Sequence, residues 1–153
     1  MATTDADDRW FVDTNVLVYV TDVQSPFHDE ACERLRSAKQ HGVDLCISSQ
    51  VVREYISAAT RCVAPGQPVP WLSILDNCLR FRRMFKILPE GEETASRLCE
   101  LLATVRVVGK QVHDANIVAT MLVHGIPHLF TYNVVDFERY TDLITVVPGV
   151  RMG

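Results

Sequence analysis

Four acidic residues, each in a short apolar context, are the side chains of this sequence best suited to do chemistry. They are Asp13, Glu54, Asp114 and Asp136. A carboxylate beside strongly apolar sequence is costly to desolvate unless a positive group meets it, and a shared divalent cation is the simplest such group. Mg²⁺ prefers oxygen ligands, keeps several waters and is often held by a few carboxylates beside a phosphate. The four acids therefore predict metal-dependent hydrolysis of a phosphodiester.

Two of the acids occupy positions that favour a functional role. Asp13 ends a short apolar run, and α/β proteins place their ligands where strands end. Asp13 could also cap the helix expected to follow, and the two roles are compatible. Asp114 shares a helix face with apolar residues three, four and seven positions later. It lies in the first turn of that helix, where the macrodipole favours a carboxylate and where a cap is the simpler alternative.

The other two acids are weaker signals when each is taken alone. Glu54 falls inside an expected helix and could be an exposed residue paired with a nearby arginine. Asp136 follows Thr131 and Asn133 in a stretch typical of an ordinary loop. The side chains of Thr131 and Asn133 could instead hold a water, a phosphate oxygen or a metal-bound ligand.

Strands and helices are predicted to alternate along the chain and to position these acids. Strands are expected at residues 10–13, 43–47, 86–88, 127–131 and 143–147, and helices at 15–20, 26–41, from Ser48 or Ser49 to about 60, 71–85, 89–104 and 113–124. Strongly apolar strands separated by helices predict a parallel sheet that is covered on both faces. The ligand site is then expected beyond the carboxyl ends of the strands.

Several helix ends have recognisable signals. Ser25 is predicted to be an N-cap with Pro26 in the first helical position, and Ser48 or Ser49 to cap the third helix. Gly125 is predicted to end the last helix. The segment 63–70 is rich in proline and glycine and is expected to be a turn region.

Length and composition indicate one globular domain. The 153 residues are 48% hydrophobic and 22% charged, the balance of an ordinary soluble protein, and no apolar run is long enough to span a bilayer. Residues 1–8 are expected to be a short disordered tail and residues 9–153 a single domain. The five cysteines form no close pair, which predicts reduced thiols buried in the core of a cytoplasmic protein.

The net charge of −4 argues mildly against a nucleic-acid-binding protein, because phosphate contacts need Lys and Arg. It does not exclude one, since a cation bound in an acidic site reverses the local sign of the charge. Arg106 and Lys110 form a small basic cluster whose simplest interpretation is a solvated face.

As a set, these segments resemble the PIN domain family of ribonucleases, and above all the toxin subunit of bacterial VapBC toxin–antitoxin systems. The matching segments are Phe11–Leu17 (FVDTNVL), Val52–Tyr55 (VREY), His113–Ala119 (HDANIVA) and Thr131–Phe137 (TYNVVDF). The likeness extends from Trp10 to Val147. Each segment is a weak signal alone, but all four in this order are a specific one.

The resemblance implies a three-layer α/β/α sandwich with a mainly parallel sheet. It implies that the acids gather at one end and bind Mg²⁺, or Mn²⁺ in its place, through Asp13, Glu54, Asp114 and Asp136. Asn15, Thr131 and Asn133 match the polar residues that accompany the acids. It further implies an endoribonuclease toxin that cleaves RNA, forms a homodimer and is covered at its active site by a cognate antitoxin.

Two alternatives remain open from the sequence. The first is a catalytically silent PIN-fold module that binds RNA or protein, although an intact set of four acids argues against it. The second is phosphotransfer through Asp13. Haloacid-dehalogenase-like phosphatases need a second Asp two residues later, and this chain has Asn15 there.

Overall fold

The sheet of this protein has five strands, all parallel, in the order β3-β2-β1-β4-β5. The computed structural model describes residues 8–150. The strands are β1 Arg9–Val12, β2 Asp44–Ser48, β3 Lys86–Leu88, β4 His128–Thr131 and β5 Thr145–Pro148. The predicted parallel sheet is therefore confirmed. The predicted N-terminal tail lies outside the described residues, apart from Asp8.

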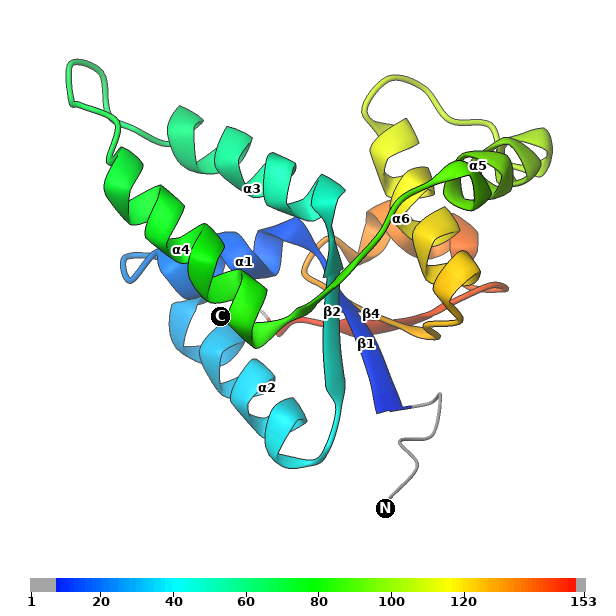
Figure 1. The fold of residues 1–153 in the computed structure, drawn as a ribbon, viewed down its shortest axis with the longest axis horizontal. Coiled ribbons are helices and arrows are strands. Elements are labelled where there is room, and N and C mark those ends of the chain that lie inside the picture. The colour runs from blue at the N-terminus through cyan, green and yellow to red at the C-terminus, as the bar shows by residue number, and fades with distance from the viewer. Residues whose placement is uncertain (1–7, 151–153) are drawn as a thin grey trace.

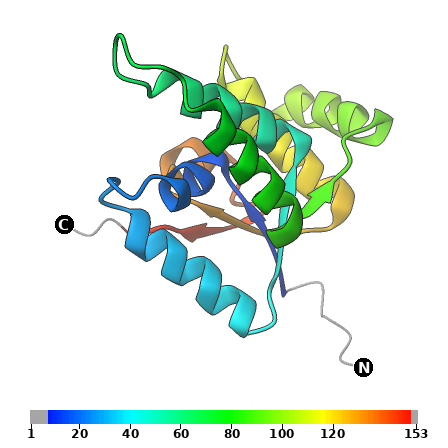
Figure 2. The same cartoon turned by 60° about the vertical axis from the view of Figure 1, so that its left-hand side comes forward.

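Helices cover the sheet on both sides. They are α1 Thr14–Thr21, α2 His28–Gln40, α3 Ser49–Arg61, α4 Trp71–Met84, α5 Glu92–Thr104 and α6 Gln111–His124. Figure 1 shows α1, α2 and α4 on one side of the strands and α5 and α6 on the other, and Figure 2 shows the same arrangement after a turn of 60°. The predicted α/β/α sandwich is confirmed.

Burial along the central strands explains this layering. Phe11 and Val12 on β1 are fully buried, as are Leu129 and Phe130 on β4. Successive strand residues point to opposite faces of a sheet. Two consecutive buried apolar residues therefore require cover on both faces, which the two helical layers provide.

The register of the sheet brings two predicted site residues together. Val12 pairs with Phe130, and the Asp13 amide donates to the Phe130 carbonyl at 3.0 Å. Asp13 and Thr131 therefore lie side by side at the carboxyl edge of the sheet. β2 ends at the same edge and leads directly into α3, the helix that carries Glu54.

Three predicted helix starts are wrong. The helix expected from residue 113 begins two residues earlier, at Gln111. The helix expected to begin at Pro26 begins at His28, because the Ser25 hydroxyl accepts from the Phe27 amide at 3.2 Å within a tight turn. The helix expected from residue 89 begins at Glu92, because Glu90 turns back toward α3.

Two further expectations are corrected. The loop predicted around Asp136 is a short 3₁₀-helix, η2, at Val134–Tyr140, which Phe137 and Tyr140 anchor in the core. All five thiols are free, but Cys62 and Cys99 are exposed, so the expectation of core thiols is wrong for these two.

The start of α3 is capped from a distance. Ser48 is the N-cap by position, but its buried hydroxyl has no partner among the described residues. The Glu90 carboxylate accepts instead from the Ser49 hydroxyl at 2.6 Å and from the backbone amide of Gln50 at 2.8 Å. Ser48 is therefore the N-cap residue, as predicted, but the Glu90 carboxylate and not the Ser48 side chain accepts the hydrogen bond from the first turn.

Glu90→Ala is expected to lower the free energy of unfolding by about 1–2 kcal/mol, because it removes a charged cap at a helix N-terminus. The matched control is Ser48→Ala, which removes a hydroxyl that bonds to nothing and should be close to neutral. Urea unfolding followed by circular dichroism measures both variants. An equal loss of stability in the two would contradict the assignment of the cap.

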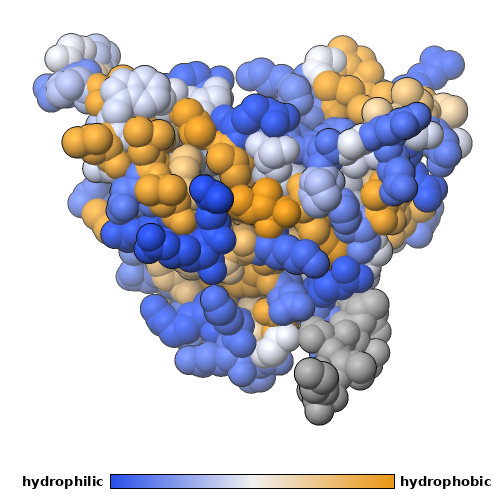
Figure 3. Space-filling view, in the orientation of Figure 1, coloured by the Kyte–Doolittle hydropathy of each residue, from blue (hydrophilic) through white to orange (hydrophobic). Residues whose placement is uncertain are grey.

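The outer side of α4 carries several exposed apolar side chains. Leu72 is 84% exposed, and Trp71, Leu75 and Leu79 are each about half exposed. Figure 3 shows this hydrophobic surface over α4. Exposed apolar surface of this kind is common where proteins bind other molecules. Within residues 8–150, no helix is both long and apolar enough to cross a bilayer.

Candidate active site

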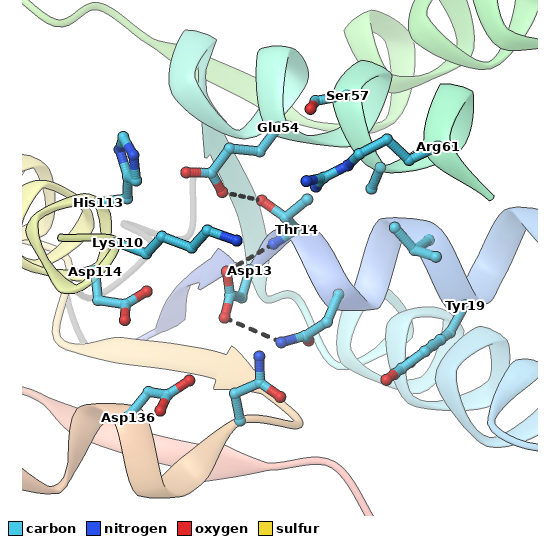
Figure 4. A pocket seen from close by; sticks show the side chains of 14 residues that line it. Asp13, Thr14, Tyr19, Glu54, Ser57, Arg61, Lys110, His113, Asp114 and Asp136 are labelled. Atoms are coloured by element: carbon cyan, nitrogen blue, oxygen red, sulfur yellow. Dashed lines mark hydrogen bonds between the residues drawn. The ribbon is translucent and has the colours of Figure 1, made fainter.

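One cavity of about 550 Å³ is lined by all four acids. The acids come from four separate elements: Asp13 follows β1, Glu54 lies within α3, Asp114 in the first turn of α6, and Asp136 on η2 (Figure 4). Asn15 and Asn133 line the same cavity, whereas Thr131 does not.

Asp13 is the most buried of the acids, at 6% exposure. Its Oδ1 accepts from the Thr14 amide at 2.7 Å, which makes it the N-cap of α1. Its Oδ2 accepts from the Thr131 hydroxyl at 2.7 Å and from the Asn15 amide at 3.1 Å. Burial raises the pKa of Asp13 to about 6, although these hydrogen bonds act in the opposite direction.

The polar residues predicted beside the acids form a layer behind Asp13. The fully buried Thr131 hydroxyl donates to Asp13 and accepts from the Asn133 amide at 3.0 Å. The Asn15 side chain donates to Thr131 at 3.1 Å and accepts from the Tyr132 amide at 3.2 Å. Asn15 and Thr131 therefore fix the position of Asp13.

Both oxygens of Glu54 are held by neighbours that sequence patterns did not single out. Oε2 accepts from the Thr14 hydroxyl at 2.7 Å, a bond shown in Figure 4. Oε1 accepts from the side-chain amide of Gln50 at 2.8 Å. The same Gln50 amide donates to the His113 carbonyl at 2.8 Å, so it ties α3 to the residue before Asp114. The only sequence signal was the spacing of Gln50 and Glu54, four residues apart on one helix.

Asp114 is half-buried, and its carboxylate makes no hydrogen bond within the described chain. Burial, together with the charges of Asp13, Asp136 and Glu54, raises the pKa of Asp114 to about 7, while Arg139 acts in the opposite direction. The cavity is therefore a site of concentrated negative charge that a cation would relieve.

These raised pKa values predict that the metal-free protein loses stability as pH rises from about 4 to 8. The folded state keeps protons on Asp13 and Asp114 up to about pH 6 and 7, whereas the unfolded chain releases them near 3.8. Because the folded state binds more protons in this range, unfolding becomes easier as pH rises. Asp114→Asn should therefore stabilise the protein at pH 8 by about 1–3 kcal/mol, after allowance for solvent screening, and have little effect at pH 4. Urea unfolding in EDTA at both pH values measures this, and an equal effect at the two would contradict it.

Two cations also line the cavity. Arg61 is the last residue of α3, and Lys110 precedes α6 as its N-cap. Within residues 8–150, no carboxylate lies within 4 Å of either cationic group. Lys110 was expected on a solvated face with Arg106, and the structure places it at the site.

The donor set suits a hydrated divalent ion. No three His, Cys, Asp or Glu side chains of the described chain are gathered closely enough to hold one ion between them. Mg²⁺ does not need such a cage, since it keeps several waters and is usually held by one or two carboxylates beside a phosphate. Carboxylate oxygens around a cavity open to water therefore fit Mg²⁺ or Mn²⁺.

Comparison with known proteins finds a relative by sequence and several solved structures with a similar fold. Ribonuclease VapC24 from Mycobacterium tuberculosis is 26% identical over 140 residues, which span 88% of this chain and 96% of VapC24. Among solved structures, a chain of VapBC2 from Rickettsia felis, bound to a DNA fragment from its promoter, has a TM-score of 0.69 at 14% identity and covers 92% of this chain and 98% of its own. VapC20 from Mycobacterium tuberculosis, a toxin that cleaves the sarcin–ricin loop, has a TM-score of 0.61 at 17% identity, with coverage of 78% and 86%.

The two structural likenesses show a common fold. The model of the PIN domain family matches residues 10–143, which is most of the chain and includes all four acids. This protein belongs to the PIN domain family.

Proposed function

We propose that this protein is a metal-dependent endoribonuclease that hydrolyses RNA phosphodiester bonds. The observation that carries the proposal is the convergence of four acids, from four separate elements, on one cavity. The name of its relative, Ribonuclease VapC24, supports RNA as the substrate. We further propose that residues 9–153 act as one domain and that the protein is the toxin component of a type II toxin–antitoxin system.

The cofactor in this proposal is Mg²⁺, with Mn²⁺ as a substitute. Asp13 and Asp114 would hold the ion, and Glu54 would complete its surroundings directly or through water. When bound, the ion makes water more acidic and stabilises negative charge on phosphate oxygens. Asn15 and Thr131 keep the Asp13 carboxylate in place through their hydrogen bonds.

Asp136 and Asn133 are proposed to act on the attacking water. The Asp136 carboxylate makes no hydrogen bond within the described residues and lines the cavity, so it can orient a water and accept its proton. As the water oxygen bonds to phosphorus, the bond from phosphorus to the leaving ribose oxygen breaks, and that oxygen takes up a proton. A second ion held partly by Asp136 is an equivalent way to position the water.

The test is RNA cleavage by the purified chain, freed of any bound partner, in Mg²⁺, in Mn²⁺ and in EDTA. Cleavage with either ion and none in EDTA is the expected result. A folded protein that binds Mn²⁺ and RNA but cuts nothing in total RNA would overturn the proposal and leave a silent binding module.

The proposed partners are a cognate antitoxin and a second copy of the chain. The structural relatives include VapBC toxin–antitoxin complexes, which supports an antitoxin partner. We propose that this partner covers the cavity. The exposed apolar side chains of α4 are surface that a homodimer partner could cover. We place the protein in the cytoplasm, where its RNA substrate would be found.

A further inference from the structure

Tyr19 and Arg61 line one end of the active-site cavity. Tyr19 belongs to α1 and Arg61 to the last turn of α3. Figure 4 shows both to the right of Asp13 and Glu54, whereas His113 lies to the left of them. The cavity therefore extends past Asp13 along a wall that carries both an aromatic ring and a guanidinium.

The ring of Tyr19 is held in place. It packs against Phe27, with ring centroids 4.7 Å apart, and meets Tyr132 edge-on at 4.9 Å and 85°. The Tyr19 hydroxyl makes no hydrogen bond with any described residue, so the packing of the ring alone fixes the side chain. A half-buried ring that is braced by two others and also lines a cavity is a ready platform for a flat ligand.

Arg61 has no acidic partner on its own helix. Four other helical arginines pair with an acid three or four residues away, in Arg34–Glu30, Arg36–Glu33, Arg80–Asp76 and Arg97–Glu100. The residues three and four positions before Arg61 are Ala58 and Ser57, and both line the same cavity. The guanidinium is therefore left available, and its planar fork suits a phosphate.

We propose that Tyr19 and Arg61 form a nucleotide-binding subsite for single-stranded RNA. An unpaired base next to the cut stacks on Tyr19, and a phosphate beside it binds Arg61. Stacking on an aromatic ring needs a base that has left its helix, so the subsite selects single strands and loops over continuous duplex. Arg61 also offsets the repulsion between the acids and the polyanion. The inference rests on the proposed ribonuclease function and adds its substrate class.

The test measures RNA binding, so that it does not depend on catalysis. All variants carry Asp114→Asn to prevent cleavage, and a short fluorescent single-stranded RNA is titrated in Mg²⁺ by anisotropy. Tyr19→Leu should weaken RNA binding roughly 5- to 150-fold, which is the loss of affinity expected when one base can no longer stack. Tyr19→Phe should stay within about twofold, because it keeps the ring. Arg61→Gln should weaken binding and reduce the slope of log K against log salt by about 0.7.

The control is Arg53→Gln, an exposed cation of the same helix as Arg61 that does not line the cavity. It should bind RNA like the Asp114→Asn parent. Equal binding by Tyr19→Leu and the parent, or equal loss in Tyr19→Phe and Tyr19→Leu, would overturn the subsite, as would a parent that binds no RNA. If the unmodified chain fails to cleave while Tyr19-dependent binding persists, the proposed catalysis fails and the subsite stands.

Discussion

Asp114→Asn is expected to slow RNA cleavage on the order of 10³-fold or more while the protein stays folded. The Asp114 carboxylate lines the cavity and makes no hydrogen bond within the described residues, so its exchange for an amide breaks no contact. Burial and three neighbouring acids raise its pKa, because the ionised carboxylate loses hydration and is repelled by the other negative charges. Loss of that charge removes a ligand for the proposed ion and leaves the architecture intact.

The measurement is kcat/KM for RNA in Mg²⁺, beside circular dichroism and urea unfolding. Asp142→Asn is the matched control, because it removes the same charge from an exposed acid that does not line the cavity. It should cleave RNA at the normal rate. Activity of Asp114→Asn within tenfold of the unmodified chain would remove Asp114 from the catalytic set. Asp13→Asn is the less informative variant, since Asp13 also accepts three hydrogen bonds.

Mn²⁺ is expected to bind on the order of 100-fold more weakly at pH 5.5 than at pH 7.5. The pKa of Asp13 is raised to about 6 and that of Asp114 to about 7, and both carboxylates must be ionised to hold the ion. Below these values each acid keeps its proton, and the ion has to displace it. Cleavage should decline over the same pH range.

Isothermal titration calorimetry at the two pH values measures the affinity, and buffers of different ionisation enthalpy count the protons released. At pH 6 binding should release more than one proton in the unmodified chain and fewer in Asp114→Asn. A Mn²⁺ affinity that is the same at both pH values, with no proton release, would show that Asp13 and Asp114 are not the ligands.

Local sequence determined most of the architecture and the positions of the acids. Consecutive apolar residues such as Phe11 and Val12, in strands that alternate with helices, predict a parallel sheet covered on both faces. Gly125, with φ of +64°, ends α6 where predicted, because glycine adopts this conformation at little cost. Asp13 and Asp114 were found because strand ends and first helical turns are local signals.

The tertiary structure decided which groups hold these acids and what else lines the cavity. Glu90 caps α3 from 41 residues along the chain from Ser49, and Gln50 reaches His113 across 63 residues. Tyr19 and Arg61 meet at one cavity from separate helices. Hydrophobic periodicity shows which face of an element is buried, but a hydrogen bond between distant side chains depends on sheet order and helix packing. The acids could therefore be named from the sequence, whereas their supporting contacts could be identified only in the folded chain.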